Sequence, residues 1–288
     1  KMAEALLVAP ACLLPFAVAA PIPRWARWRG VVLATLLMLG VSLTWLMAVD
    51  LTPASQRPYL ASTTRNSAIE LAIEHNGLDR LLWGHSMSHP GAQGDLSRKT
   101  IGDPGPLRLL DRRLATQFGW LLPLAAVGCL AALSGKRDSR DLWHWPRAGS
   151  LDQRQQDLLF WGTWFLTGAV FFSTANYFHR YYTIVLAPAL ATLVAIGLIA
   201  LWQAFWRPGL TRWLLPFALL LTAAFQVWLL APDADWRLRL APGLVTLTLL
   251  ASLTLWHLAR SGTWAERYVA RCAVIAGMTA LLLAPTTW

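Results

Sequence analysis

The sequence predicts an all-α polytopic membrane protein, with about eight transmembrane helices and one long outer loop that carries short helices. Three observations support this class. Of the 288 residues, 56% are hydrophobic and only 14% are charged, whereas about a quarter of the residues in a soluble domain are charged. Apolar stretches of roughly 17 to 25 residues, long enough to cross a bilayer, recur along the chain. The chain also holds 17 tryptophans, a residue that is enriched at membrane–water boundaries.

The apolar runs predict eight spans that are separated by more polar connections. These spans cover residues 3–21, 30–48, 117–135, 158–176, 184–205, 213–231, 240–258 and 270–285. Alternate short connections are strongly basic: they hold thirteen Lys or Arg, against three in the short connections on the opposite side. Because positive residues favour cytoplasmic connections, we expect the basic side in the cytoplasm and residues 49–116 outside. The net charge of +10 thus indicates orientation in a membrane, and nucleic acid is not expected as a partner.

The remaining bulk features favour one membrane domain. The three cysteines, Cys12, Cys129 and Cys272, fall in apolar spans without metal-ligand spacing, and we interpret them as small core residues. We predict a single transmembrane domain over residues 1–288. The start at Lys1-Met2, with an outward-facing first span, favours a fragment of a longer protein.

The outer segment 49–116 has helix punctuation of its own. Ser67 and Glu70 have the S-x-x-E spacing of a capping box, and Asn76 followed by glycine favours a helix stop. A short helix is therefore predicted over residues 66–77.

Two further stretches complete this outer segment. Residues 85–106 are rich in Gly, Pro and Ser, which predicts a mobile loop. In the stretch 105–124, the leucines Leu107, Leu110 and Leu114 have the spacing of one helical face. This pattern predicts a short helix that lies in the membrane interface before the next span.

Polar side chains gather between two apolar runs in the stretch "NYFHRYY", residues 176–182. One interpretation is an aromatic belt with a snorkelling arginine. The other is a site for a phosphate or pyrophosphate, since arginine offers a planar fork of donors and tyrosine hydroxyls add neutral ones. The candidate substrate-binding residues here are His179, Arg180, Tyr181 and Tyr182.

The predicted outer helix supplies a second set of candidates. Its polar residues would lie near the mouth of the membrane domain, where a hydrophilic substrate is gripped, or they form an ordinary solvated face. The candidates are Asn66, Asn76, Asp79 and Arg80. His85 and His89 lie four residues apart, but the flanking Gly84 and Pro90 disfavour a helix there, and no metal site is expected.

Three stretches together resemble one family. They are "VDLTPASQRPYLASTTRNSAIELAIEHNGLDRL" (49–81), "GDPGPLRLLDRRLATQFGWLLPLA" (102–125) and "GAVFFSTANYFHRYYTIVLAPALATLVAIGL" (168–198). They resemble bacterial membrane glycosyltransferases of the protein O-mannosyltransferase type, relatives of the lipid A aminoarabinose transferase in the GT-C superfamily. The resemblance covers roughly Ala48 to Trp228.

The resemblance implies a multi-pass enzyme of the bacterial cytoplasmic (inner) membrane. Such an enzyme takes a hexosyl or pentosyl group from a polyprenyl-phosphate-linked donor on the outer face and transfers it with inversion to a protein, lipid or glycan. No cofactor is implied besides this lipid-linked sugar substrate, and membrane lipid is the surrounding partner. The family's general base is an acidic residue in the first outer loop, and nothing here matches that loop. The resemblance therefore indicates the C-terminal part of such an enzyme, which we expect to be inactive by itself.

The same resemblance suggests roles for the candidate residues. Arg180, Tyr181 and Tyr182 would hold the donor phosphate while its lipid chain lies between helices. The outer candidates Asn66, Asn76, Asp79 and Arg80 would lie over the sugar or the acceptor.

Two other functions stay open from the sequence. A secondary transporter or lipid flippase needs ionisable residues near mid-membrane or broken helices in matched halves, and the predicted spans hold almost no charges. A non-catalytic membrane scaffold with a partner-binding outer loop is the other alternative.

Overall fold

The computed structural model describes residues 6–61, 63–73, 100–134, 151–176, 178–259 and 264–287. Within these residues all regular structure is helical, which confirms an all-α polytopic membrane protein. The chain divides into two compact units, each described by itself here. The first comprises residues 1–113 and 145–185, and the second comprises residues 114–144 and 186–288.

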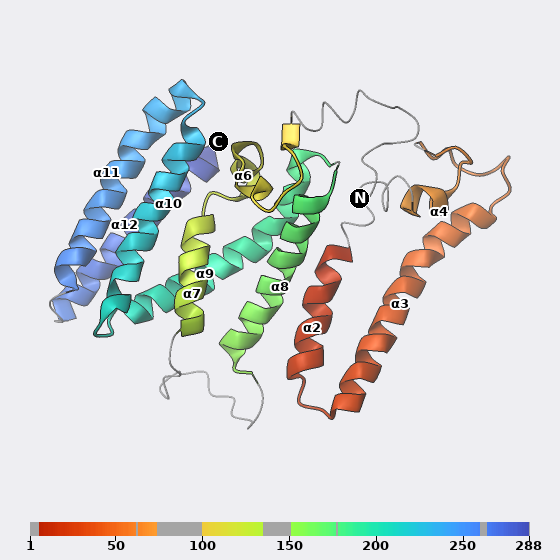
Figure 1. Cartoon of the computed structure of the whole chain (residues 1–288), viewed down its shortest axis with the longest axis horizontal. Helices are drawn as coiled ribbons and strands as arrows, with labels where there is room; N and C mark the ends of the chain where they lie inside the picture. Colours follow the sequence, from red (N-terminus) through yellow and green to blue (C-terminus); the bar gives the residue numbers. More distant parts are fainter. Residues whose placement is uncertain are drawn as a thin grey trace. The chain divides into compact units, whose positions relative to one another are not determined.

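The first unit contains the short helix α2 and the longer helices α3 and α8 (Figure 1). Their bounds are Ala9–Ala19, Arg24–Leu51 and Gln153–Thr174. A short 3₁₀ helix, η1 (Leu6–Val8), precedes α2, and α2 packs along α8, where the Thr167 hydroxyl donates to the Leu7 carbonyl at 2.9 Å. Helix α8 begins at a capping box between Asp152 and Gln155. The Asp152 carboxylate accepts from the Gln155 backbone N–H, and the Gln155 side-chain oxygen accepts from the Asp152 backbone N–H.

Shorter elements of this unit lie after α3 and before α8. The outer segment contains α4 (Ala68–Glu70) and a single 3₁₀ turn, Arg108–Leu110. After α8 the chain forms the 3₁₀ helix η4 (Arg180–Leu186), and the described part of the first unit ends there at residue 185.

The described part of the second unit contains five apolar helices that pack on one another (Figure 1). These are α7 (Leu122–Ser134), α9 (Ala187–Phe205), α10 (Leu214–Leu230), α11 (Ala234–Leu258) and α12 (Trp264–Thr287). Helix α6 (Arg112–Phe118) leads into α7 across a bend of 68°. The Asp233 carboxylate caps the start of α11 by accepting from the Trp236 backbone at 3.1 Å.

Each of the eight predicted spans coincides with a helix, but the count of eight spans is not confirmed. Five described helices are long and apolar enough to cross a membrane, and six if α6 and α7 form one bent span. The helix at the first predicted span is short, since η1 and α2 together cover only residues 6–19. Helix α8 has 22 residues, but it begins with the polar stretch "QRQQD", which leaves a shorter apolar run.

The predicted interfacial helix is only partly correct. A short helix, α6, does precede α7. However, Leu107 and Leu110 are exposed whereas Leu114 is fully buried, so these leucines do not share one face. The reason is that Leu110 ends a 3₁₀ turn and α6 starts only at Arg112, so the α-helical spacing is interrupted between them.

Close packing of small residues joins α7 to α9 in the second unit. A Cβ atom added to Gly128 would lie 2.4 Å from the Gly197 Cα, and one added to Gly197 would lie 2.8 Å from the Gly128 Cα. The two backbones are therefore in direct contact, as small residues allow between membrane helices.

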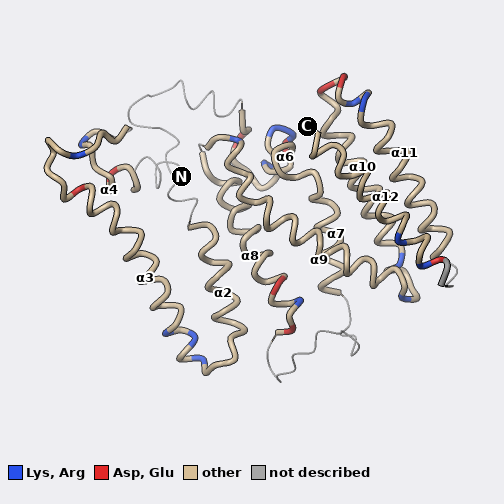
Figure 2. The backbone as a smooth tube through the Cα atoms, turned by 180° about the vertical axis from the view of Figure 1, so that it is seen from behind, with Lys and Arg blue, Asp and Glu red and all other residues tan. Residues whose placement is uncertain are grey.

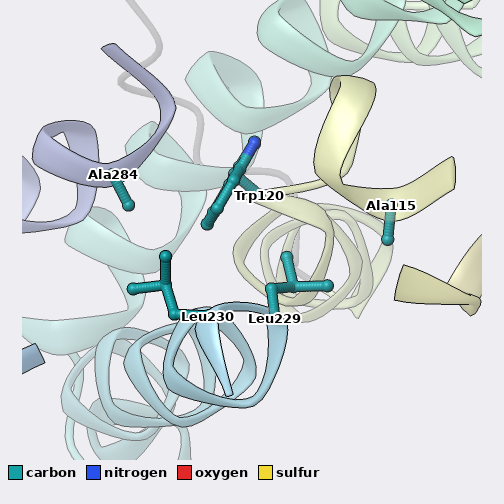
Figure 3. Close-up of a cluster of buried hydrophobic side chains, with 5 residues drawn as sticks. All are labelled: Ala115, Trp120, Leu229, Leu230 and Ala284. Atoms are coloured by element: carbon teal, nitrogen blue, oxygen red, sulfur yellow. The ribbon is translucent and has the colours of Figure 1, made fainter. Parts of the chain in front are cut away.

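A buried cluster lies at the bend between α6 and α7 in the second unit. Figure 3 shows Trp120 directed between Leu229 and Leu230 of α10 and Ala284 of α12, with Ala115 of α6 on the other side. The indole Nε1 donates to the Thr116 carbonyl at 2.9 Å, so this large side chain is buried without leaving its donor unpaired.

Charged residues of the second unit lie at its two ends (Figure 2). At one end, Arg212 donates to the carbonyl of Ala259, which follows α11, and the Arg267 guanidinium of α12 lies over the ring of Trp206, which follows α9. The arginines of two predicted cytoplasmic connections therefore share one end of this unit.

Candidate functional site

The carboxyl end of α8 is held by the outer segment that precedes it in sequence. The last carbonyls of a helix have no partner within the helix. Here the backbone N–H of Gly105 donates to the Ser173 carbonyl at 2.9 Å, and the Arg108 guanidinium donates to the carbonyls of Phe172, at 3.2 Å, and Ala175. A cation at this end also interacts favourably with the helix dipole.

Arg108 is a buried clamp. Its side chain donates to the carbonyls of Ile101 at 3.1 Å and Gly102 at 2.9 Å, and only 5% of the residue is exposed. The guanidinium carbon lies 4.9 Å from the ring centre of Phe178. Burial lowers the pKa of Arg108, while the charge of Asp103 opposes this shift. A guanidinium is a very strong base, so the side chain keeps its charge.

Arg108 is not among the site residues that the sequence predicts. The helical spacing places it away from the apolar face, whereas its partners include carbonyls more than sixty residues later in the chain. An arginine enclosed by apolar residues, in "PLRLL", is the signal that could have indicated a buried cation.

Directly after the clamped residues, three aromatic rings form a compact cluster. Phe178 is buried, and the following rings belong to His179, Tyr181 and Tyr182. His179 stacks on Tyr181 with 5.4 Å between ring centres, and both rings meet Tyr182 edge-on at 5.5 and 4.7 Å. Edge-to-face and stacked contacts at these distances are favourable, so the structure brings these three predicted residues together.

Arg180 lies between His179 and Tyr181 in the chain and is exposed. Its backbone carbonyl accepts from the buried Thr183 hydroxyl at 2.8 Å, which helps to hold the 3₁₀ turn. Among the residues that the structure describes, none bonds to its guanidinium or pairs with it. A guanidinium without a carboxylate partner, beside exposed aromatic rings, is able to bind an anion.

The outer residues after α3 are organised around Asp50. Its carboxylate accepts from the Ser67 hydroxyl at 2.6 Å and from the backbone N–H groups of Ala68, at 2.6 Å, and Ile69, at 3.2 Å. Arg57 lies 4.0 Å from the same carboxylate. Asp50 therefore caps α4 from a distance of seventeen residues and folds the outer segment back onto the end of α3.

Asn66 has a structural position in this segment. It adopts a positive φ of 53°, which asparagine tolerates better than most residues. Its side-chain oxygen accepts from the Leu60 backbone at 2.6 Å and its amide nitrogen donates to the Pro58 carbonyl at 3.1 Å. Both ends of the amide thus stabilise the turn, and none of its bonds reaches residues 178–182.

The predicted capping box of α4 is half correct. The Ser67 hydroxyl accepts from the Glu70 backbone at 3.1 Å, as predicted. The Glu70 carboxylate does not accept from the Ser67 backbone N–H, as a full capping box requires. It accepts from the Thr64 backbone and hydroxyl and from the Arg65 backbone. The reason is that the preceding turn folds under the helix and offers nearer donors. These bonds, from the Thr64 hydroxyl first, hold the pKa of Glu70 below its ordinary value.

The other outer candidates lie outside the described residues. These are Asn76, Asp79 and Arg80, and the same holds for His85, His89 and most of the predicted loop 85–106. Among the described residues, no group of three or more His, Cys, Asp or Glu side chains has a geometry that could hold a metal ion.

Two curated relatives align with the whole of this chain. Both are from Bacillus subtilis (strain 168): "Putative mannosyltransferase YycA" is 29% identical over 367 aligned positions, and "Putative mannosyltransferase YkcB" is 27% identical over 376. The chain spans about half the length of these relatives, 51% and 50% respectively. No family model matches the chain. No solved structure matches it either. The chain is thus similar, along its whole length, to one half of proteins that carry a mannosyltransferase name.

Proposed function

We propose that this chain is part of a membrane glycosyltransferase that takes a sugar from a polyprenyl-phosphate donor on the outer face of the bacterial cytoplasmic membrane. The names of the two relatives support sugar transfer, and the long apolar helices support a donor that is itself a lipid. Transfer proceeds with inversion to a protein, lipid or glycan acceptor, and the general base belongs to a part of the enzyme that this chain does not match.

The observation that carries the proposal is the exposed Arg180 guanidinium in its aromatic cluster. The donor has a phosphate at the membrane boundary and a long apolar chain below it. Arg180 has no partner among the described residues, and α8, which leads to it, is a helix of 22 residues with apolar side chains along most of its length. An anion at this place would receive charge-assisted hydrogen bonds from the guanidinium.

During transfer, the bond between the sugar and the phosphate oxygen breaks and negative charge grows on the departing lipid phosphate. A cation that is already in position stabilises this developing charge. Tyr181, which follows Arg180 in the chain, is exposed and its hydroxyl can add a neutral donor, while the His179 ring is stacked on the Tyr181 ring. We assign Tyr182 to the same phosphate contact.

Arg108 acts here as a positioning residue. It binds the carbonyls of Phe172 and Ala175 and covers Phe178, which immediately precedes the cluster. The cluster is therefore presented from a fixed backbone. The outer candidates Asn76, Asp79 and Arg80 are assigned to the sugar or the acceptor, and Asn66 shapes the turn that leads to them.

The test is a binding measurement with a mannosyl-phosphoryl-polyprenol donor and the chain in detergent micelles. Hydrogen bonds to charged groups contribute about 1.5–3 kcal/mol each, so Arg180→Gln is expected to weaken binding about 10- to 100-fold. The matched control is Arg239→Gln, which removes the same charge from α11. Polyprenyl phosphate without the sugar serves as a second ligand, because a phosphate contact predicts the same loss for both ligands.

Equal affinity of Arg180→Gln and the parent chain for both ligands would refute the assignment of the phosphate contact. Tyr181→Phe refines the result, since it keeps the stacked ring and removes only the hydroxyl. A loss confined to the sugar-bearing donor would move Arg180 from the phosphate to the sugar.

A further inference from the structure

Among the described residues, the end of the second unit where α9 and α11 finish and α12 begins carries more positive than negative charge. Four arginines lie there: Arg207, Arg212, Arg267 and Arg271. We call this surface the arginine end. Among the described residues of this unit, Glu266 is the only carboxylate at the arginine end, whereas the opposite end has two aspartates, Asp233 and Asp235, against two arginines, Arg237 and Arg239 (Figure 2).

Contacts within the unit hold these arginines near one another. Arg212 belongs to η5 (Leu210–Trp213) and donates to the carbonyl of Ala259, which follows α11, so this bond ties η5 to the end of α11. The Arg267 guanidinium lies 5.2 Å from the ring centre of Trp206, the residue before Arg207. Arg271 follows Arg267 by four residues on α12, and residues at this spacing are neighbours on a helix surface.

These guanidiniums have donors to spare. Among the described residues, the Arg212 guanidinium donates only to the Ala259 carbonyl. The Arg212 Nε is buried and has no hydrogen-bond partner there. Arg207 and Arg271 have no side-chain partner in the part of the chain that the structure describes. Four neighbouring cations with unused N–H groups, and one nearby carboxylate, form a surface that is complementary to an anion.

The surroundings of the arginine end point to a lipid and not to a soluble anion. Leu210 is 85% exposed and Trp256 is 51% exposed. The Trp256 ring packs on the Trp213 ring with 4.3 Å between the ring centres. A free phosphate would leave these apolar side chains exposed, whereas an acyl chain attached to the phosphate would cover them. Tryptophans at this level are typical of the membrane–water boundary.

We infer that the arginine end binds an anionic phospholipid, with the phosphate between Arg207, Arg212 and Arg267 and an acyl chain along Leu210 and Trp256. Basic pockets between membrane helices on the cytoplasmic side are suited to such headgroups. This inference is independent of the proposed sugar transfer, because it uses residues of the second unit only.

The test is native mass spectrometry of the full chain in micelles, titrated with dioleoylphosphatidylglycerol or, as the neutral reference, dioleoylphosphatidylcholine. A basic residue near an anionic lipid contributes about fivefold in affinity. Arg207→Gln and Arg271→Gln are therefore each expected to weaken phosphatidylglycerol binding about fivefold and to leave phosphatidylcholine binding unchanged. Neither variant removes a side-chain contact among the described residues, so both are expected to fold.

The control is Arg237→Gln, which removes one positive charge at the opposite end of the same unit. Unchanged phosphatidylglycerol binding in Arg207→Gln and Arg271→Gln would overturn the inference. An equal loss in Arg237→Gln would also overturn it, because binding would then follow net charge and not this surface. Displacement of the lipid by millimolar glycerol phosphate would show a site for a soluble phosphate and would refute the lipid assignment.

Discussion

The contact between Gly128 and Gly197 decides whether Gly128→Ala stabilises or destabilises the protein. Alanine stabilises a helix relative to glycine by about 1 kcal/mol. At Gly128, however, the new methyl carbon would lie 2.4 Å from the Gly197 Cα and 2.8 Å from its carbonyl carbon. Carbon atoms pack at about 3.5–4.0 Å, so α7 and α9 have to separate by about 1 Å or more.

The cost of this separation outweighs the gain in helix propensity. Extra methyl groups in packed interiors cost about 1–3 kcal/mol, and a backbone atom cannot move aside as a flexible side chain does. We take the upper part of that range, about 3 kcal/mol, and subtract the 1 kcal/mol from helix propensity. Gly128→Ala is therefore expected to lower the free energy of unfolding by about 2 kcal/mol.

Two other glycines of the second unit serve as matched controls. A Cβ at Gly243 in α11 would meet nothing within 4 Å, so Gly243→Ala is expected to be neutral or stabilising. At Gly277 in α12 the nearest atoms are side-chain carbons of Ala251 at 3.3 Å and Leu219 at 3.4 Å, so Gly277→Ala is expected to fall between the two.

The assay is reversible unfolding of the three variants in mixed micelles with increasing sodium dodecyl sulfate, followed by circular dichroism. The expected order of stability is Gly243→Ala, then Gly277→Ala, then Gly128→Ala. A Gly128→Ala variant as stable as Gly243→Ala would refute the direct backbone contact between α7 and α9.

Three further predictions concern buried polar groups. Arg108→Lys keeps the charge but loses the planar fork that serves several carbonyls, and the same unfolding assay should show a loss of about 2–3 kcal/mol; an unchanged stability would contradict the clamp. Because the folded pKa of Glu70 is lowered, its contribution to stability is present above its ordinary pKa of 4.5 and is lost as pH falls through the folded pKa. Glu70→Gln should therefore flatten the fall of stability below about pH 5, measured by unfolding at several pH values. The Gln226 side chain donates to the carbonyls of Trp120 and Leu281, so Gln226→Leu should cost about 1 kcal/mol in that assay, and a stabilised variant would contradict these bonds.

The candidate site was predictable where its residues are neighbours in sequence. His179, Arg180, Tyr181 and Tyr182 are consecutive in the chain, and the structure adds the ring contacts among His179, Tyr181 and Tyr182. Their proposed contact with phosphate stays a prediction.

The clamp that supports this cluster was not predictable in the same way. Arg108 and its partners at the end of α8 are separated by more than sixty residues. A guanidinium that binds backbone carbonyls leaves no pattern in the partner sequence, because every residue has a carbonyl. Asp50 is a similar case: its bonds to Ser67 and the start of α4 depend on how the chain folds back over seventeen residues.

The sequence by itself determined the class and the positions of the helices, because burial of backbone polar groups in lipid forces long apolar runs to become helices. Only the tertiary structure decided which faces touch. The contact of Gly128 with Gly197, the bend between α6 and α7, and the shared end of Arg212 and Arg267 all depend on interhelical geometry. Apolar side chains satisfy a lipid and a neighbouring helix equally well, so hydrophobicity alone does not distinguish these two environments.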